Sequence, residues 1–375
     1  MPSLRPDVDP DGLSEFSVVF TDRSLNHMSA KFQTVMRDLS ALLREAYHAE
    51  GVALVPGGGS YAMEAVARQF ASGRHALIVR NGWFSYRWSQ IFEMGGFAAK
   101  TTVVMARQTG NRPRSPYAPP PIEEVVAKVQ ETRPDLVFAP HVETSAGLIL
   151  PDGYISALAA AAHDVGALLV LDCIASGAVW VDMAQTGVDV LISAPQKGWS
   201  ASPSTGLVMF SARATERLEQ TTSNSFAMDL KKWRAIMAAF EAGGHAYHAT
   251  MPTDALVGLR DAMLETRALG YGTLKAAQWA LGDGVRALLA ERGVLSVATE
   301  GFGAPGVVVS YTDDPDIQNG KKFREAGMQI AAGVPLQVGE GAEFKTFRLG
   351  LFGLDKLTDV EGTIARVRAV VERVM

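Results

Sequence analysis

The sequence predicts an α/β protein: a large domain with a mostly parallel seven-stranded sheet between helices, plus a smaller C-terminal α+β domain. From about Val52 onward, short aliphatic runs alternate with longer amphipathic stretches, the pattern of parallel strands joined by helices. Several runs are apolar throughout, which indicates strands buried on both faces. After about Asp254 the pattern changes to longer helices with fewer strands, which indicates a second, smaller unit.

Seven apolar runs are the expected strands of the large domain. They occupy residues 52–55, 75–80, 101–105, 136–139, 167–172, 188–193 and 206–210. Amphipathic patterns between them predict helices at residues 61–71, 122–131 and 154–165. Ligands of an open parallel sheet collect beyond the carboxyl ends of the strands. The polar residues that directly follow each run are therefore the first candidates for a functional site.

The C-terminal unit is predicted to mix helices and strands. Helices are expected at residues 253–269, 274–292, 318–326 and 360–374, and strands at residues 307–311 and 346–351. We divide the chain into an N-terminal segment over residues 1–20, a large domain over 21–254 and a small domain over 255–375. No repeat or clear linker separates the two domains, so we expect them to share a wide interface.

Charge and composition exclude several classes of function. The chain has 35 basic and 40 acidic residues without long runs of one sign, so we expect no nucleic acid and no membrane partner. No apolar run reaches the roughly 20 residues that span a bilayer. The polar, proline-containing start lacks the apolar core of a signal peptide. The one cysteine, Cys173, cannot form an internal disulfide, which fits a reducing compartment. We expect a soluble cytoplasmic protein whose partner is a small molecule or a second copy of the chain.

A glycine-rich loop, Pro-Gly-Gly-Gly-Ser over residues 56–60, links the first expected strand to a helix. Glycines allow close approach of a ligand, and the first amides of a helix have no partner within it, so the loop is a candidate phosphate site. Gly57, Gly59 and Ala62 also match the Gly-x-Gly-x-x-Ala fingerprint of dinucleotide binding, which leaves an NAD(P)-binding oxidoreductase as an alternative. Against it, the next strand ends without an acidic residue to hold an adenosine ribose. A tight turn without a ligand is the third possibility.

Asp172 and Lys197 follow two of the most apolar runs. A carboxylate at the end of a buried strand is unfavourable unless it meets a cation or hydrogen-bond donors. A lysine next to Gly198 and Trp199 at such a strand end is expected to be partly desolvated, which lowers its pKa and makes it a usable nucleophile. Alone, each could be an ordinary turn aspartate or surface lysine. Together with a phosphate-type loop they meet the requirements of pyridoxal 5′-phosphate, whose phosphate, ring nitrogen and aldehyde need an amide cradle, a carboxylate and a lysine.

Three segments, residues 141–147, 171–176 and 187–206, resemble the class V aminotransferases of pyridoxal-phosphate fold type I. Within that group the sequence is most similar to the alanine:glyoxylate and serine:glyoxylate (serine:pyruvate) branch, from about residue 25 to the C-terminus. The resemblance implies that Lys197 is the Schiff-base lysine and that Asp172 pairs with the pyridine nitrogen. It also implies that Gly58, Gly59 and Ser60 form the loop around the cofactor phosphate, and that Gln196, beside the lysine, is a further cofactor contact.

The resemblance implies further contacts with the cofactor and the substrate. Phe84 stands where the family stacks an aromatic ring, usually tryptophan, on one face of the cofactor, and Ile174 would cover the other face. Thr144 would lie near the phenolic oxygen of the cofactor and the substrate. Arg348 would bind the α-carboxylate of the substrate.

The resemblance also implies a homodimer whose active site is shared across the interface. Tyr247 and Thr250 match the motif that reaches the phosphate from the neighbouring subunit. The N-terminal segment is expected near the active site, although residues 15–20 depart from the Pro-Gly-Pro-type opening of the family. His245 and His248 form a His-x-x-His pair without a nearby carboxylate, so no metal site is expected.

The implied activity is that of an aminotransferase that moves the amino group of a small neutral 2-amino acid, alanine or serine, to glyoxylate or pyruvate as the 2-oxo acid. No second arginine is clearly placed for a dicarboxylate, so aspartate and glutamate are less favoured. An aminophosphonate donor, as in related class V enzymes, stays open, as does a non-catalytic cofactor-binding protein. Cysteine desulfurases of this class need a mobile cysteine in the C-terminal region, and this chain has none after Cys173.

Overall fold

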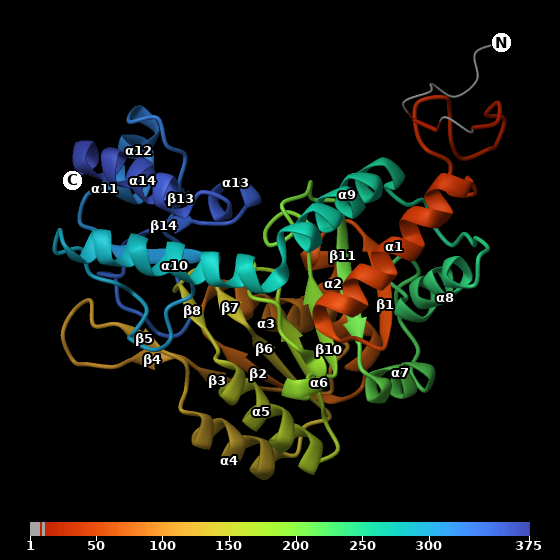
Figure 1. The fold of residues 1–375 in the computed structure, drawn as a ribbon. Helices are drawn as coiled ribbons and strands as arrows, with labels where there is room; N and C mark the ends of the chain where they lie inside the picture. The colour runs from red at the N-terminus through yellow and green to blue at the C-terminus, as the bar shows by residue number, and fades with distance from the viewer. Residues whose placement is uncertain (1–7, 10–11) are drawn as a thin grey trace.

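The computed structural model describes residues 8–9 and 12–375 and contains a central sheet of seven strands (Figure 1). The order across the sheet is β1-β11-β10-β9-β6-β2-β3. The bounds of these strands are β1 Gly51–Pro56, β2 His75–Arg80, β3 Lys100–Met105, β6 Leu136–Pro140, β9 Leu168–Asp172, β10 Val190–Ser193 and β11 Thr205–Phe210. Each predicted strand of the large domain is confirmed, with ends that differ by two residues or fewer.

The direction of β11 is the feature of the sheet that positions the site. β11 is antiparallel to both of its neighbours, β1 and β10, whereas the pairs β10·β9, β9·β6, β6·β2 and β2·β3 are parallel. The sheet is therefore mostly parallel, as predicted. Because β11 runs back from the edge at which β10 ends, the loop of residues 194–204 stays at the carboxyl edge of the parallel strands.

Helices pack against the sheet and enclose its centre. Those of the large domain are α1 Ala30–Tyr47, α2 Gly59–Phe70, α3 Trp83–Gly95, α4 Ile122–Thr132, α5 Asp152–Asp164, α6 Met183–Thr186, α7 Ala212–Glu219 and α8 Leu230–Glu241. α1 and α8 contact β1, α2 contacts β11, α3 contacts β2, and α5 contacts β9. The central strands β6, β9, β10 and β11 are buried along their whole length, which confirms the interpretation of their apolar runs. Short strand pairs, β4 Arg107–Gln108 with β5 Tyr117–Ala118 and β7 Val142–Glu143 with β8 Leu148–Ile149, lie outside the sheet.

The C-terminal part builds a second, three-stranded antiparallel sheet in the order β12-β14-β13. Its elements are α9 Thr253–Leu269, α10 Tyr271–Ala290, β12 Val307–Tyr311, α11 Pro315–Gln318, α12 Lys321–Glu325, β13 Ala331–Ala332, β14 Thr346–Gly350, α13 Leu354–Leu357 and α14 Val360–Val374. The helix expected near residues 318–326 corresponds to α12, which begins three residues later than expected. The separate helix α11 was not predicted, and Gly320, with a left-handed φ of +79°, lies between the two. The domain boundary expected after residue 254 falls in the first turn of α9 and stays a prediction.

The described residues of the N-terminal segment lie beyond the start of α1 (Figure 1). There the Asn26 side chain donates a hydrogen bond to Glu15 at 2.8 Å. Residues 1–7 and 10–11 are outside the described part of the chain, and a place for this segment near an active site stays a prediction. In residues 8–9 and 12–375, no helix is long and apolar enough to cross a membrane.

Candidate active site

A cavity of about 230 Å³ lies where the carboxyl ends of β1, β6, β9 and β10 meet. Eight residues proposed from the sequence line it, namely Gly59, Ser60, Phe84, Thr144, Asp172, Ile174, Gln196 and Lys197. Met63, Arg87, Val142 and Ala175 complete the lining. A larger cavity of about 670 Å³ lies between α10 and residues 293–303, but it contains none of these residues. We place the functional site in the smaller cavity because the reactive groups converge there.

Lys197 lies on the loop between β10 and β11, with its Nζ between two aromatic rings. Nζ is 5.9 Å from the centre of the Phe84 ring and 5.7 Å from that of Phe352. Burial is the main cause of the lowered pKa of this amine, and Asp172 acts in the opposite direction. The positive charges of Arg87 and Arg348 lower the pKa further. A lysine with a lowered pKa has a larger share of uncharged amine at neutral pH, which is the form that acts as a nucleophile.

Asp172 is the last residue of β9, and its side chain is buried at 7% exposure. Within the described residues, its carboxylate accepts one hydrogen bond, from the Ile174 backbone N–H at 2.9 Å. Burial raises the pKa of Asp172 to about 6, although this hydrogen bond and Lys197 both favour the charged form. A buried carboxylate with so few partners fits a cationic ligand atom, such as the protonated nitrogen of a pyridine ring.

The glycine loop ends in the N-terminus of α2. Gly57 has φ of +125°, and the N-cap residue Gly58 has no side chain to cap the first amides of the helix. A Cβ on Gly59 would lie 2.5 Å from Ile174, so a side chain there would displace this cavity residue, whereas a Cβ on Gly58 would meet no atom within 4 Å. Gly58 is not among the lining residues. Open space next to uncapped helix amides fits a phosphate group.

Phe84 is held in place by a buried carboxylate that sequence reasoning missed. Glu143, at the end of β7, accepts hydrogen bonds from the backbone N–H groups of Phe84 (3.2 Å), Ser85 (2.9 Å) and Ser145 (3.1 Å). The Ser85 and Ser145 hydroxyls each donate to it at 2.7 Å. Because these bonds cap the first turn of α3, they fix the ring of Phe84 at the cavity wall. The sequence shows Glu143 only as a polar residue after a strand, 59 positions from Phe84.

Arg348 lies in β14 of the small domain, close to the cavity but outside its lining. Its Nε donates a hydrogen bond to the Ala332 carbonyl at 2.8 Å, and its Cζ is 5.6 Å from the centre of the Phe84 ring. Burial lowers the pKa of its guanidinium. The hydrogen bond to β13 orients the side chain, so the free end of the guanidinium can pair with a carboxylate in the cavity.

Arg87 is a second arginine at the cavity, and sequence reasoning missed it. It lies on α3, one turn after Phe84, and its Nη1 donates a hydrogen bond to Ser60 Oγ at 3.0 Å. Its Cζ is 4.8 Å from the centre of the Phe84 ring. The spacing of three residues from Phe84 is the signal that could have found it, but α3 was not among the predicted helices.

Tyr247 and Thr250 do not line the cavity of their own chain. The Tyr247 hydroxyl and Thr250 Oγ1 are 3.0 Å apart, and Tyr247 is 52% exposed. The Tyr247 ring lies 5.5 Å from the His27 ring, before the start of α1. A shared site across an interface stays a prediction. Among the residues that the structure describes, no group of three or more His, Cys, Asp or Glu side chains is placed to hold a metal ion.

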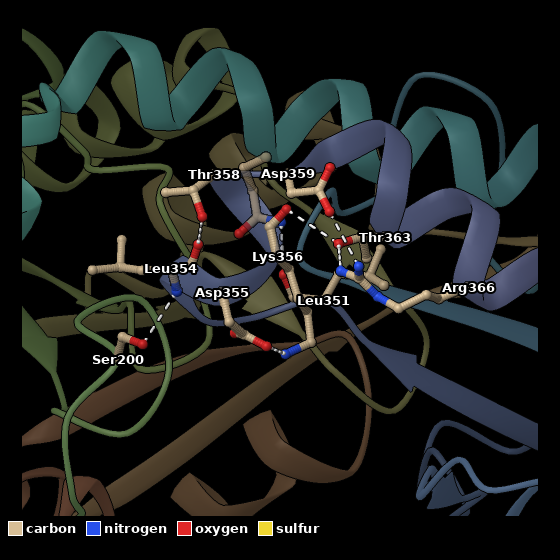
Figure 2. Close-up of polar contacts among 10 residues, drawn as sticks. Ser200, Leu351, Leu354, Asp355, Lys356, Thr358, Asp359, Thr363 and Arg366 are labelled. Carbon is tan, nitrogen blue, oxygen red and sulfur yellow. Dashed lines mark hydrogen bonds and ion pairs between the residues drawn. The ribbon is translucent and has the colours of Figure 1, made fainter.

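The loop that carries Lys197 is tied to the small domain. Ser200, which has φ of +56°, accepts a hydrogen bond on Oγ from the Leu354 backbone N–H at 3.2 Å (Figure 2). Leu354 begins the short helix α13, and its carbonyl in turn accepts a bond from Thr358 at 2.8 Å. On the next helix, Arg366 donates to Asp359 at 3.1 Å (Figure 2). The Ser200–Leu354 bond therefore joins the Lys197 loop to the small domain, and the other two bonds lie within that domain.

The fold is that of the pyridoxal-phosphate enzymes of fold type I, as the solved structures of similar shape indicate. An alanine–glyoxylate aminotransferase from Nostoc sp. superposes with a TM-score of 0.76 at 23% identity, over 92% of this chain and 88% of that one. Residues 14–302 match the family Aminotransferase class-V. The protein therefore belongs to the class V aminotransferases, and the family resemblance is confirmed.

Three curated relatives have similar sequences. A protein named soluble hydrogenase, small subunit, from Synechococcus sp. is 25% identical over 92% of this chain and 86% of its own length. A 2-aminoethylphosphonate–pyruvate transaminase from Paraburkholderia phymatum is 28% identical, over 92% and 90% respectively. An alanine–glyoxylate aminotransferase from Oryctolagus cuniculus is 28% identical over 64% of this chain and 59% of its own length. Two of the three names describe transaminases, in agreement with the family.

Proposed function

We propose that the protein is a pyridoxal-phosphate-dependent aminotransferase that moves the amino group of a small neutral 2-amino acid, alanine or serine, to glyoxylate or pyruvate. The observation that carries the proposal is the convergence of Lys197, Asp172 and the N-terminus of α2 on one cavity. A lysine with a lowered pKa, a buried carboxylate and uncapped helix amides are the three groups that this cofactor requires.

Each residue has a chemical task in this proposal. When bound, the cofactor supplies an aldehyde that captures amines and a ring that takes up the electrons released at the substrate α-carbon. Lys197 holds the cofactor between turnovers and moves the proton at the α-carbon, a task that its lowered pKa favours. Asp172 keeps the ring nitrogen protonated. Thr144, Gln196, Ile174 and Phe84 line the same cavity and would hold the ring of the bound cofactor.

The substrate assignment depends on Arg348 and on the size of the cavity. Arg348 binds the α-carboxylate as a charge-assisted pair, which also orients the α-carbon bond that breaks. The cavity of about 230 Å³ has to hold the cofactor as well, which favours a small side chain on the substrate. The similarity to an alanine–glyoxylate aminotransferase supports this choice. The similarity to an aminoethylphosphonate transaminase keeps an aminophosphonate as the alternative donor.

Two further parts of the proposal concern assembly and location. We propose a homodimer in which Tyr247 and Thr250 complete the site of the neighbouring subunit, since neither lines the cavity of its own chain. A cytoplasmic location is supported by the single, buried cysteine, because a protein with no possible internal disulfide suits a reducing compartment.

The proposal is tested by the visible spectrum of the purified protein and by chemical trapping. We expect a yellow cofactor band that alanine or serine bleaches and glyoxylate or pyruvate restores. Reduction with borohydride before digestion should leave the cofactor on the peptide that contains Lys197. Lys197→Ala should lose the band, whereas the control Lys100→Ala, at an exposed position of β3, should keep it. A wild-type protein without the band, or a band that survives Lys197→Ala, would contradict the proposal.

A further inference from the structure

Three cationic side chains surround the ring of Phe84. Arg87 Cζ is 4.8 Å from the ring centre, Arg348 Cζ 5.6 Å and Lys197 Nζ 5.9 Å. Among the lining residues of the cavity, Asp172 is the one carboxylate. The walls therefore carry an excess of positive charge, which favours anionic groups on the ligands. The proposed reaction uses Lys197 and Arg348 and leaves Arg87 without a task.

The contacts of Arg87 direct its charge toward the start of α2. Its Nη1 donates to Ser60 Oγ at 3.0 Å, and Ser60 belongs to the first turn of that helix. No ion pair joins Arg87 to a carboxylate in residues 8–9 and 12–375, and the Asp172 carboxylate at the cavity interacts with it electrostatically without a direct ion pair. A guanidinium next to the positive end of a helix is electrostatically unfavourable until an anion binds between them.

The helix that carries Arg87 is rigidly fixed. Its first turn is capped by the buried Glu143 carboxylate through the backbone N–H groups of Phe84 and Ser85. The guanidinium also stacks on the Phe84 ring, one turn earlier on the same helix. Arg87 is therefore held in place before any ligand binds, which reduces the entropy lost when it binds one.

We propose that Arg87 is a phosphate-binding residue: together with Ser60 and the first amides of α2, it binds the phosphate group of the cofactor. The inference rests on the proposed function and deepens it. An arginine at this cavity could instead bind a second acid group on the substrate. The hydrogen bond to Ser60 favours the phosphate, because Ser60 belongs to the turn that the phosphate contacts. Arg348 is then the arginine left for the substrate, which suits donors with a single acid group.

The test compares the cofactor with its unphosphorylated form, pyridoxal. Full-length protein freed of cofactor is titrated with each, and binding is followed by absorbance and by equilibrium dialysis. Arg87→Gln should weaken binding of pyridoxal phosphate about 10- to 100-fold, the effect of one charge-assisted hydrogen bond, and should leave pyridoxal binding nearly unchanged. Arg87→Lys should recover part of the loss. The control Arg112→Gln, at an exposed position between β4 and β5, should bind both as the wild type does.

Two outcomes would overturn the inference while leaving the proposed function intact. The first is an unchanged ratio of the two affinities in Arg87→Gln. The second is normal cofactor binding together with a selective loss of activity toward 2-aminoethylphosphonate or aspartate, which would make Arg87 a substrate-binding residue. A folding defect is separated from a binding defect by thermal unfolding: inorganic phosphate should raise the melting temperature of the cofactor-free wild type and not that of Arg87→Gln. A wild type that binds neither form of the cofactor would instead contradict the proposed function itself.

Discussion

At the scale of single residues, burial shifts the pKa values of Asp172 and Lys197 in the directions that favour the uncharged form of each side chain. The pKa of Asp172 is raised to about 6, and that of Lys197 is lowered. Without a ligand, both groups therefore reduce the stability of the fold at neutral pH. A cationic ring nitrogen beside Asp172 removes part of this penalty, so the destabilisation of the empty site contributes to cofactor affinity.

Replacing Asp172 with asparagine should stabilise the cofactor-free protein in a pH-dependent manner. The folded pKa of about 6 lies above the unfolded value of 3.8. The free energy of unfolding therefore falls as pH rises from about 4 to 6, by about 3 kcal/mol in all. The amide that replaces the carboxyl group cannot ionise, so D172N should be more stable than the wild type at pH 8 by up to this amount and nearly equal to it at pH 4.

Denaturant unfolding of both cofactor-free proteins between pH 4 and 8 measures this difference. An advantage of D172N that is as large at pH 4 as at pH 8 would contradict the assigned pKa. D172N should also bind pyridoxal phosphate more weakly, because the partner of the ring nitrogen is lost.

Asp172 and Lys197 could be predicted from the local pattern, because one closes an apolar run and the other follows one within four positions, whereas most other site residues were implied by the family resemblance. Asp172 and Lys197 are recognisable because burial of the preceding strand makes a charged residue there conspicuous. Arg87 has no such signal, since it lies on a helix whose apolar pattern is interrupted by polar residues. Glu143 is fixed by bonds to a segment about 60 positions away, a tertiary contact that a local pattern does not contain.

At the scale of elements, the close packing of β11 on α2 sets the position of the glycine-rich loop, residues 56–60. Gly206, in the first half of β11, faces the first turn of α2. A Cβ on Gly206 would lie 2.3 Å from the Ala62 Cβ and 2.9 Å from the Gly58 carbonyl. The absence of a side chain at this position lets the helix N-terminus approach the edge of the sheet at which the ligand binds.

Gly206→Ala should therefore affect both stability and cofactor binding. Relief of the contact with Ala62 has to move α2 or β11, at a cost of about 1–3 kcal/mol in the free energy of unfolding. Because Gly58 and Ser60 move with the helix, affinity for pyridoxal phosphate should fall as well. The control Gly153→Ala, on α5 with no atom within 4 Å of the added Cβ, should leave cofactor affinity unchanged and should not lower stability. Denaturant unfolding measures the effect on stability, and cofactor titration measures the effect on affinity. An unaltered affinity in Gly206→Ala would contradict the claim that the contact between Gly206 and α2 sets the position of the loop.

Seven strands of the large sheet could be predicted because each is a short apolar run between polar segments. The direction of β11 could not, since the alternation of side chains is the same in a parallel and an antiparallel strand. The split between α11 and α12 depends on the left-handed φ of Gly320, and glycine also occurs inside helices, as Gly258 does in α9. The sequence thus predicts whether a segment is a helix or a strand. The direction of a strand and the point at which a helix is interrupted depend on tertiary packing.

At the scale of the whole molecule, the two parts of the chain meet at the active site. Gln278 of α10 is fully buried and donates to the carbonyls of Pro305 (3.2 Å) and Leu351 (3.1 Å). Its Oε1 accepts from the Ala178 backbone N–H at 3.4 Å, on the segment that follows Asp172. Arg348 therefore comes to the cavity from a small domain that is held against the large one. The sequence predicts a wide interface but not these contacts, because each joins segments far apart in the chain.

The shared active site of the proposed homodimer can be tested with two inactive variants. Lys197→Ala removes the lysine from its own chain, and Tyr247→Phe combined with Thr250→Ala removes the groups that the neighbouring subunit should supply. In a mixed dimer of the two variants, one site carries both defects and the other carries none. Differently tagged chains, coexpressed and purified through both tags, should therefore recover about half of the wild-type activity, because a two-fold dimer has two equivalent sites. Each parent dimer should be almost inactive.

Two outcomes would contradict this arrangement. Mixed dimers no more active than their parents would place Tyr247 and Thr250 in the site of their own chain. A fully active Tyr247→Phe, Thr250→Ala parent would show that neither residue is needed in the site.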